Sequence, residues 1–293
     1  MRLDYHPIDR RKPTSIALQA FRENVTSQNG EDGIIARIFE LIGTTNKVCI
    51  EFGAADGKEL SNTWALINER GWSGVLIEGR KSSFRTLEAR YGGNSKVRLF
   101  NRYVGSGINS LDGILAEGNC PTEPDLLCID VDGVDWHIWQ SLSRYQPRLL
   151  LIEFNPTIPN DVLFVPDDNP SRSHGCSLSA LIELGKAKGY ELAATTDWNA
   201  FFVHQTLFPA LGIVDNSIDA MHQCDPYETK LFQLYDGTLL TAGNDRLMWA
   251  GGPLRVRNVP PWNERWRRFV RALKLLPGIR QARWLMHRLQ RRA

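Results

Sequence analysis

The stretch 47-KVCIEFGAADG-57 decides the fold, because it joins an apolar run to an acid and a glycine-containing turn. The run KVCIEFG has the composition of a buried β-strand. Similar apolar runs recur along the chain, and helical patterns lie between them. Strands that alternate with helices predict an α/β fold with a doubly wound, mostly parallel sheet.

The expected elements alternate regularly over most of the chain. Strands are predicted at 47–53, 74–79, 96–104, 126–131, 148–154, 190–196 and 200–205. Helices are predicted at 27–43, 60–70, 81–91, 108–117, 135–144 and 177–190. Ser177 is suited to cap the last of these helices, and Gly189 to end it. The final two strands follow each other directly, which predicts an antiparallel edge.

Other segments interrupt this alternation. Residues 155–176 form a long loop rich in Pro, Asn and Asp, and loops of that length are usually functional or disordered. Asp-Gly between the apolar runs of 230–243 predicts a hairpin. We therefore divide the chain into an N-terminal arm (1–26), a ligand-binding α/β domain (27–205), an accessory hairpin and acceptor region (206–262) and a basic helical tail (263–293).

Charge is distributed unevenly along the 293 residues. The total is +2, of which residues 263–293 carry +9, leaving −7 on residues 1–262. Apolar residues of the tail repeat at helical spacing, which predicts a basic amphipathic helix. Such a helix favours an anionic membrane surface as partner, with packing on its own domain or on a second protomer of a homo-oligomer as the alternative. Nucleic acid is disfavoured because the body is acidic.

Cysteine usage indicates a reducing compartment. The five cysteines include no CxxC pair, and Cys49 and Cys128 lie in apolar runs, where they are predicted to be small core residues. The first residues have no apolar segment typical of a secretory signal. We therefore expect a cytoplasmic protein, peripheral on the inner face of the membrane if the tail binds there.

The strand ends predict a ligand site, because ligands of doubly wound sheets bind outside the carboxyl ends of the strands. Glu51 precedes the turn 53-GAADG-57, and Glu78 ends the second strand, where an acid can accept hydrogen bonds from both hydroxyls of a ribose. Acids crowding the turn disfavour a pyrophosphate, and hence an NAD or nucleotide-sugar enzyme. They suit a ligand with a ribose and a cationic end, such as S-adenosylmethionine (SAM). The predicted cofactor-binding residues are Glu51, Gly53, Ala54, Ala55, Asp56, Gly57, Glu78 and Asp130.

Further acids follow in 126-LLCIDVDGVD-135 and at the end of the next strand. Acids at strand ends and a loop histidine can serve as general bases, and the candidates here are Asp130, Asp132, Glu153 and His174. Asp135 is predicted to cap the following helix. Alternatively, Asp130, Asp132 and Glu153 could hold a divalent cation such as Mg²⁺. Metal-free base catalysis is preferred over the cation.

Several motifs together resemble the FkbM-type SAM-dependent methyltransferases. They are SQNGEDGII, EFGAADG, IDVDGVD, LLLIEFNP and 199-NAFFV-203, and the resemblance covers about residues 27–205. It implies the seven-stranded methyltransferase sheet of the Rossmann-like type. It also implies SAM-dependent O-methylation of a hydroxyl on a sugar or glycan, including lipid-linked surface polysaccharides.

A second interpretation is a catalytically silent SAM-fold module that binds a glycan or a partner enzyme. Ala55 stands where many methyltransferases carry a glycine, which favours this alternative. The combination of Glu51, Glu78, Asp130 and Asp132 favours the enzyme.

Overall fold

The computed structural model describes residues 5–104, 109–170, 173–223, 227–235 and 239–246. The chain divides into a larger unit, residues 7–225, and a smaller one formed by 1–6 and 226–293. The predicted basic tail lies outside the described residues. No helix in the described ranges is both long and apolar enough to span a bilayer.

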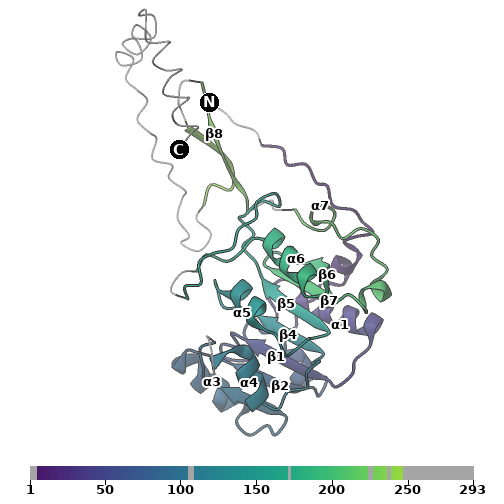
Figure 1. Ribbon diagram of the computed structural model, residues 1–293, viewed down its shortest axis with the longest axis vertical. Coiled ribbons are helices and arrows are strands. Elements are labelled where there is room, and N and C mark those ends of the chain that lie inside the picture. Colours follow the sequence, from purple (N-terminus) through teal and green to yellow (C-terminus); the bar gives the residue numbers. More distant parts are fainter. Residues whose placement is uncertain (1–4, 105–108, 171–172, 224–226, 236–238, 247–293) are drawn as a thin grey trace, which may run out of the picture. The chain divides into compact units, whose positions relative to one another are not determined.

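The larger unit is built on a seven-stranded sheet (Figure 1). Its strands are β1 (Val48–Phe52), β2 (Ser73–Ile77), β3 (Val97–Phe100), β4 (Leu126–Ile129), β5 (Leu149–Glu153), β6 (Tyr190–Thr195) and β7 (Asn199–His204). They lie in the order β3-β2-β1-β4-β5-β7-β6, and only β7 runs antiparallel to its neighbours. This confirms the predicted Rossmann-like, doubly wound methyltransferase sheet. The strand order reverses between β1 and β4, which is where such sheets bind ligands.

Helices cover both faces of the sheet (Figure 1). They are the 3-10 helix η1 (Ala17–Phe21), α1 (Glu31–Ile42), α2 (Trp64–Asn68), α3 (Lys81–Tyr91), α4 (Leu111–Glu117), α5 (Asp135–Ser141), α6 (Leu178–Ala187), the 3-10 helix η3 (Phe208–Leu211) and α7 (Ile218–Met221). Side chains of η1, α1, α2 and α3 pack on one face, and those of α4, α5 and α6 on the other. As predicted, Ser177 caps α6 by accepting a hydrogen bond from the Ala180 N–H at 3.2 Å, and Gly189 follows the helix with φ of 82°.

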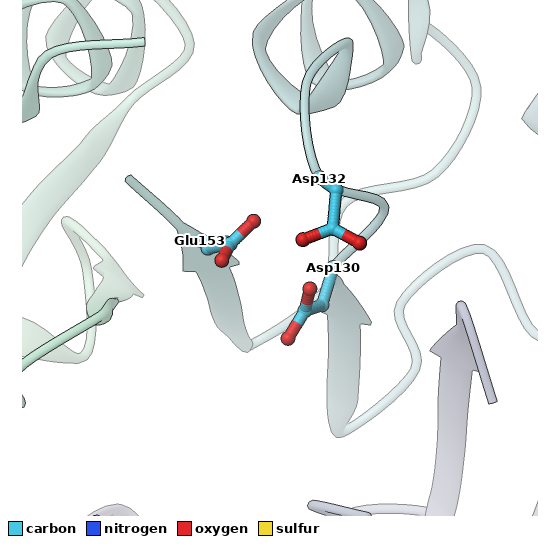
Figure 2. A group of neighbouring side chains, drawn as sticks. All are labelled: Asp130, Asp132 and Glu153. Carbon is cyan, nitrogen blue, oxygen red and sulfur yellow. The ribbon is translucent and has the colours of Figure 1, made fainter. Parts of the chain in front are cut away.

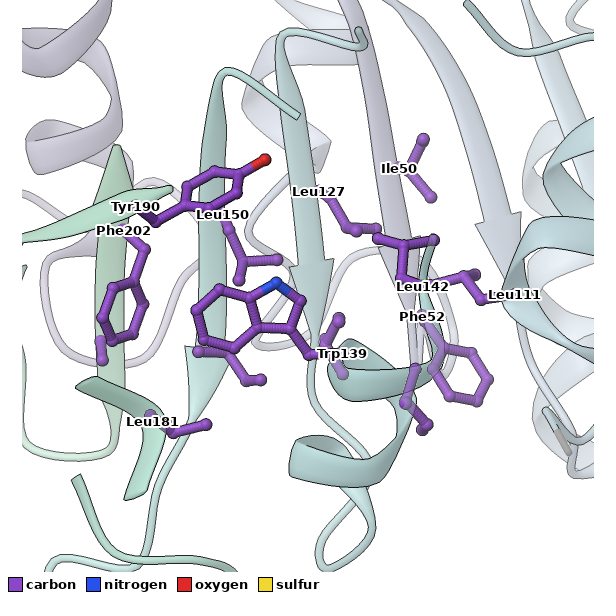
Figure 3. Close-up of a cluster of buried hydrophobic side chains, with 14 of the residues drawn as sticks. Ile50, Phe52, Leu111, Leu127, Trp139, Leu142, Leu150, Leu181, Tyr190 and Phe202 are labelled. Carbon is purple, nitrogen blue, oxygen red and sulfur yellow. The ribbon is translucent and has the colours of Figure 1, made fainter. Parts of the chain in front are cut away.

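Three aromatic rings pack together in the otherwise mostly aliphatic core on the α5 and α6 face. The Trp139 ring lies 5.0 Å from that of Phe202 and 5.9 Å from that of Tyr190, measured between centroids (Figure 3). All three side chains are buried. On the opposite face, Cys49 and Cys128 are buried among apolar side chains, which confirms their predicted place in the core.

Two of the differences from the sequence predictions concern η1 and the start of α2. Residues 17–21 of the predicted arm form η1, which packs on α1 through the buried Leu18. The sequence shows no helical periodicity there, because the element is only one short 3-10 helix. The helix predicted at 60–70 begins only at Trp64, so an extended loop separates it from the glycine turn.

The smaller unit contains a two-stranded sheet. Strands β8 (Thr229–Gln233) and β9 (Leu239–Gly243) pair antiparallel, which confirms the predicted hairpin. Its Asp-Gly turn lies outside the described residues. The Lys230 ammonium lies 5.0 Å from the centroid of the Tyr5 ring, so residues from both ends of the chain meet in this unit.

His222, which follows α7, makes folding stability depend on pH. Its side chain is buried against the Phe154 ring, and its Nε2 has no hydrogen-bond partner in the described chain. Burial, with a further contribution from Arg11, lowers the pKa of His222 to about 4, although Asp197 opposes the shift. The unfolded chain therefore binds a proton at His222 more tightly than the folded chain does. The contribution of neutral His222 to the free energy of unfolding is fully present above pH 6.5 and is lost as the pH falls toward 4.

We expect urea unfolding to show this dependence directly. Lowering the pH from 7.5 to 5 should cost about 2 kcal/mol through this one histidine. The His222→Phe variant keeps the ring packing without the titration, so its loss over the same range should be smaller by that amount. An equal loss in both proteins would contradict this assignment.

Candidate active site

Glu51, near the end of β1, holds the loop that follows this strand. One carboxylate oxygen accepts hydrogen bonds from the hydroxyls of Ser61 at 2.7 Å and Thr63 at 2.8 Å. The other accepts the Asn62 N–H at 2.7 Å. Burial raises the pKa of Glu51, and these three donors partly oppose the shift. Glu51, a predicted cofactor-binding residue, therefore uses its carboxylate to hold residues 61–63 in place. It would influence a bound ligand through the position of this loop.

The glycine turn after β1 lies against the end of β4. Gly53 has φ of 83°, and a Cβ atom there would lie 1.8 Å from the carbonyl oxygen of Asp130. The N–H groups of Gly53 and Ala54 both donate to the Ile77 carbonyl of β2, at 3.1 and 3.2 Å. Only glycine lets the chain turn this close to both neighbouring strands.

The second half of the turn is held by α3. Asp56 pairs with Arg90 at 2.8 Å and accepts the N–H groups of Lys58 and Glu59. A Cβ atom on Gly57 would lie 2.4 Å from the Leu87 side chain. Gly57, one of the predicted cofactor-binding residues, thus allows the close packing of α3. The charge of Asp56 is likewise matched by Arg90.

Glu78 follows β2 and faces the same turn. Its carboxylate, 9% exposed, accepts the N–H of Ala55 at 2.9 Å and that of Arg80 at 2.6 Å. Each oxygen uses one lone pair in this way and keeps another for a ligand hydroxyl. Beside it, a Cβ atom on Gly79 would meet the ring of Tyr103, which is 72% exposed. The sequence analysis missed Tyr103, because one aromatic residue after a strand has no distinguishing pattern.

Three acids meet where β4 and β5 end. Asp130 and Asp132 follow β4, Glu153 ends β5, and their carboxylates point toward one another (Figure 2). One oxygen from each can be chosen so that all three lie within 4.8 Å of one another. Asp132 has φ of 60°, so its side chain reaches the group through a left-handed turn.

This arrangement disfavours full ionisation of the group. Burial raises the pKa of Asp130, and the neighbouring charges of Asp135 and Asp132 raise it further. Burial also raises the pKa of Glu153. The negative charges of Asp130, Asp135 and Asp132 raise it further, in that order of size. Like charges at this separation disfavour the ionised forms, so a positive ligand or cation would be bound strongly here.

Asp135 has a different role from the predicted helix cap. It is the first residue of α5, and its carboxylate accepts the N–H groups of Val131 and Gly133, both at 2.9 Å. The residue at the cap position is Val134, which has no side-chain cap bond. Asp135 therefore fixes the loop that carries Asp132.

His174 lies apart from the group of acids that the structure brings together. Its side chain is exposed, and its carbonyl oxygen accepts a hydrogen bond from the Asn155 side chain at 2.7 Å. Asn155 comes two residues after Glu153, so the loop that bears His174 is fastened next to β5. The structure thus links this loop to the site without placing the imidazole among the carboxylates.

The start of α1 supplies further buried polar groups. One Glu31 oxygen accepts the Thr196 hydroxyl at 2.6 Å and the Asn199 Nδ2 at 3.3 Å. The charge of Glu31 also helps to raise the pKa of Asp130, so the two acids are close. Glu31 lies in the helix predicted at 27–43, and the sequence analysis assigned it no role in the site. Its contacts with residues more than 160 positions away have no sequence signal.

Two unpartnered atoms test whether these residues fit SAM. Within the described chain, Asn62 Oδ1 and Asn29 Nδ2 are buried without a hydrogen-bond partner. The Asn62 N–H donates to Glu51, near the end of β1, and the Asn29 N–H donates to Glu31, at the start of α1. A buried donor and acceptor left open are expected where a polar ligand binds. Together with the free lone pairs of Glu78, they fit a ligand that carries hydroxyls and a charged amino acid portion.

Comparison with known proteins finds similarity to solved structures. No protein-family model and no curated protein matches the chain. Solved structures that resemble it include a candidate sarcosine dimethylglycine methyltransferase from Galdieria sulphuraria, at 16% identity and a TM-score of 0.36 over 54% of this chain and 60% of that one. Another is the citrinin polyketide synthase CMeT domain, at 10% identity and a TM-score of 0.41 over 60% and 51%. A third is an O-methyltransferase family protein from Burkholderia thailandensis, at 10% identity and a TM-score of 0.38 over 59% and 58%.

The likeness to these methyltransferases is one of fold alone. The chain spans about half to three fifths of the length of these proteins. At such identities and TM-scores, they carry no argument about activity, and the FkbM family is not confirmed. The function is therefore argued from the strand ends themselves.

Proposed function

We propose that this protein is a SAM-dependent O-methyltransferase that acts on a hydroxyl of a sugar or glycan. One observation carries the proposal: the acids of β4 and β5 converge beside a glycine turn whose Ala55 N–H is held by Glu78. A nucleoside site and a site for a reacting hydroxyl thus adjoin at the point where the strand order reverses.

The residues that would hold SAM lie around the end of β1. Glu78 would accept hydrogen bonds from the ribose hydroxyls, because its oxygens have lone pairs left after binding Ala55 and Arg80. Asn62, which Glu51 fixes, would accept a hydrogen bond from the amino acid portion. SAM would supply a methyl group bound to a positively charged sulfur. The leaving group would be the neutral thioether S-adenosylhomocysteine.

The acids at the ends of β4 and β5 would position the acceptor. In the proposed transfer, the acceptor oxygen would bond to the methyl carbon while the carbon–sulfur electron pair stays on sulfur, and a carboxylate would take the hydroxyl proton and release it to water. Asp130 and Glu153 are the candidate bases for this proton. We expect the protein to accelerate the reaction more by holding the acceptor oxygen in line with the methyl group than by removing the proton.

A sugar is the favoured acceptor because the backbone of an aromatic residue, Trp198, is held beside the end of β5. The Phe154 N–H donates to the Trp198 carbonyl oxygen at 2.8 Å, which fixes Trp198 beside the end of β5. Trp198 is half-buried, so part of its surface can pack on the apolar face of a sugar ring.

One observation favours the silent module as a second candidate. Ala55 has φ of 46°, a conformation that glycine adopts more readily, so the turn here is less adaptable than one with glycine. A silent module would bind a glycan near Trp198 and bind SAM weakly or not at all.

Transfer of a labelled methyl group tests the proposal. We expect tritium from methyl-labelled SAM to enter free or lipid-linked oligosaccharides that carry unprotected hydroxyls. Methylation of a hydroxyl gives an ether, which is stable in mild alkali, so the label should remain on the sugar. Methylation of a carboxylate would give an ester, which mild alkali cleaves. Alkali-labile label would indicate another acceptor group. Absence of transfer to every sugar, despite SAM binding, would count against the proposed acceptor class.

A further inference from the structure

Among the described residues, the acids at the ends of β4 and β5 have no positively charged partner. No described Lys, Arg or His forms an ion pair with Asp130, Asp132 or Glu153. Asp130 and Glu153 are half-buried, whereas Asp132 is exposed. The group is therefore reached from solvent on one side and shielded on the other.

A second, independent observation comes from β7. Asn199 is 2% exposed, and its Oδ1 is buried with no hydrogen-bond partner in the described chain. The Asn199 Nδ2 donates a hydrogen bond to a carboxylate oxygen of Glu31 at 3.3 Å, which fixes the orientation of the amide. Asn199 pairs directly with Glu153 across β5 and β7, so the two side chains lie on the same face of the sheet. The open amide oxygen thus belongs to the surroundings of Glu153.

Carboxylate and amide oxygens together are a donor set for a hard cation. Mg²⁺ and Mn²⁺ prefer oxygen ligands, and Mg²⁺ keeps several waters that need acceptors around it. A cation would neutralise the three acids. A water bound to it would donate to Asn199 Oδ1, which otherwise remains without a donor.

We propose that Asp130, Asp132 and Glu153 bind one divalent cation of the Mg²⁺ or Mn²⁺ type, with Asn199 as acceptor for a cation-bound water. The cation would orient the acceptor hydroxyl and make its proton easier to remove. This role rests on the proposed methyl transfer, whereas the binding of the cation does not. With the cation bound, Asp130 and Glu153 would serve as its ligands and a bound water or hydroxide would take the proton in their place, which departs from the metal-free base catalysis that the sequence favoured.

The test is a Mn²⁺ titration of the full chain after treatment with a chelator, followed by electron paramagnetic resonance and calorimetry. We expect one site per chain, with affinity reduced at least about tenfold in Asp130→Asn and in Glu153→Gln. Asn199→Ala should weaken binding less, by about threefold to tenfold. The control is Asp168→Asn, which removes an exposed loop acid and should leave the affinity unchanged.

Folding of the variants is checked separately by thermal unfolding without metal. The amide substitutions remove repulsion between acids, so these variants should unfold at the same temperature as the wild type or higher. The proposal is overturned if the wild type binds no Mn²⁺ up to about 1 mM, or if Asp130→Asn binds as well as the wild type.

Failure of this inference and failure of the proposed function give different results. Binding of S-adenosylhomocysteine without Mn²⁺ binding would remove the metal site and leave the methyltransferase proposal intact. Mn²⁺ binding without binding of the nucleoside would do the reverse.

Discussion

Replacing Gly53 with alanine is expected to lower the free energy of unfolding by about 3–4 kcal/mol. A Cβ atom at this position would lie 1.8 Å from the Asp130 carbonyl oxygen, and φ is 83°. The clash is with backbone, so the ends of β1 and β4 must separate to relieve it. Urea unfolding, followed by circular dichroism, measures the loss.

Gly43 provides the matched control for this substitution. Its φ is 68°, but a Cβ atom there would meet nothing within 4 Å. Gly43→Ala should therefore cost only the conformational strain, about 1–2 kcal/mol. Equal losses in the two variants would show that Gly53 does not pack against the end of β4 as described.

Replacing Glu78 with glutamine is expected to weaken S-adenosylhomocysteine binding about 100-fold. Hydrogen bonds to a charged carboxylate contribute about 1.5–3 kcal/mol each, and a ribose offers two hydroxyls to Glu78. The glutamine amide would also direct a donor at either the Ala55 or the Arg80 N–H, which disturbs the turn. Isothermal titration calorimetry measures the affinity.

Glu88→Gln is the control for this change in charge. Glu88 is an exposed residue on α3, and its replacement should leave the affinity within about twofold of the wild type. If Glu78→Gln bound as tightly as Glu88→Gln, the ribose would lie elsewhere.

Local composition predicted most of the fold. Each of the seven strands is a short apolar run, and the helix α3 begins and ends where its pattern does, at residues 81 and 91. Errors occur where a segment owes its structure to distant contacts. The 3-10 helix η1 has no period of its own and depends on α1, and the loop before α2 is held by Glu51.

The candidate site was predictable in location but less so in detail. The rule that ligands bind at the carboxyl ends of strands places Glu78, Asp130 and Glu153 together. The partner of Asp56 is Arg90, 34 residues away, and nothing in the turn predicts it. The same holds for Asn199 and Glu31, which are 168 residues apart. The sequence shows which acids follow strands but not which of them are already bound to a neighbour.

The basic tail remains a prediction, because residues 263–293 lie outside the described chain. The site that we describe depends only on residues of the larger unit.

A crystal structure of the complex with S-adenosylhomocysteine is the most direct measurement. We predict that the ribose hydroxyls bind the Glu78 carboxylate and that the sulfur faces Asp130 and Glu153. If the nucleoside, at saturating concentration, occupies another surface or leaves Glu78 without a ribose, the protein does not bind SAM as we propose.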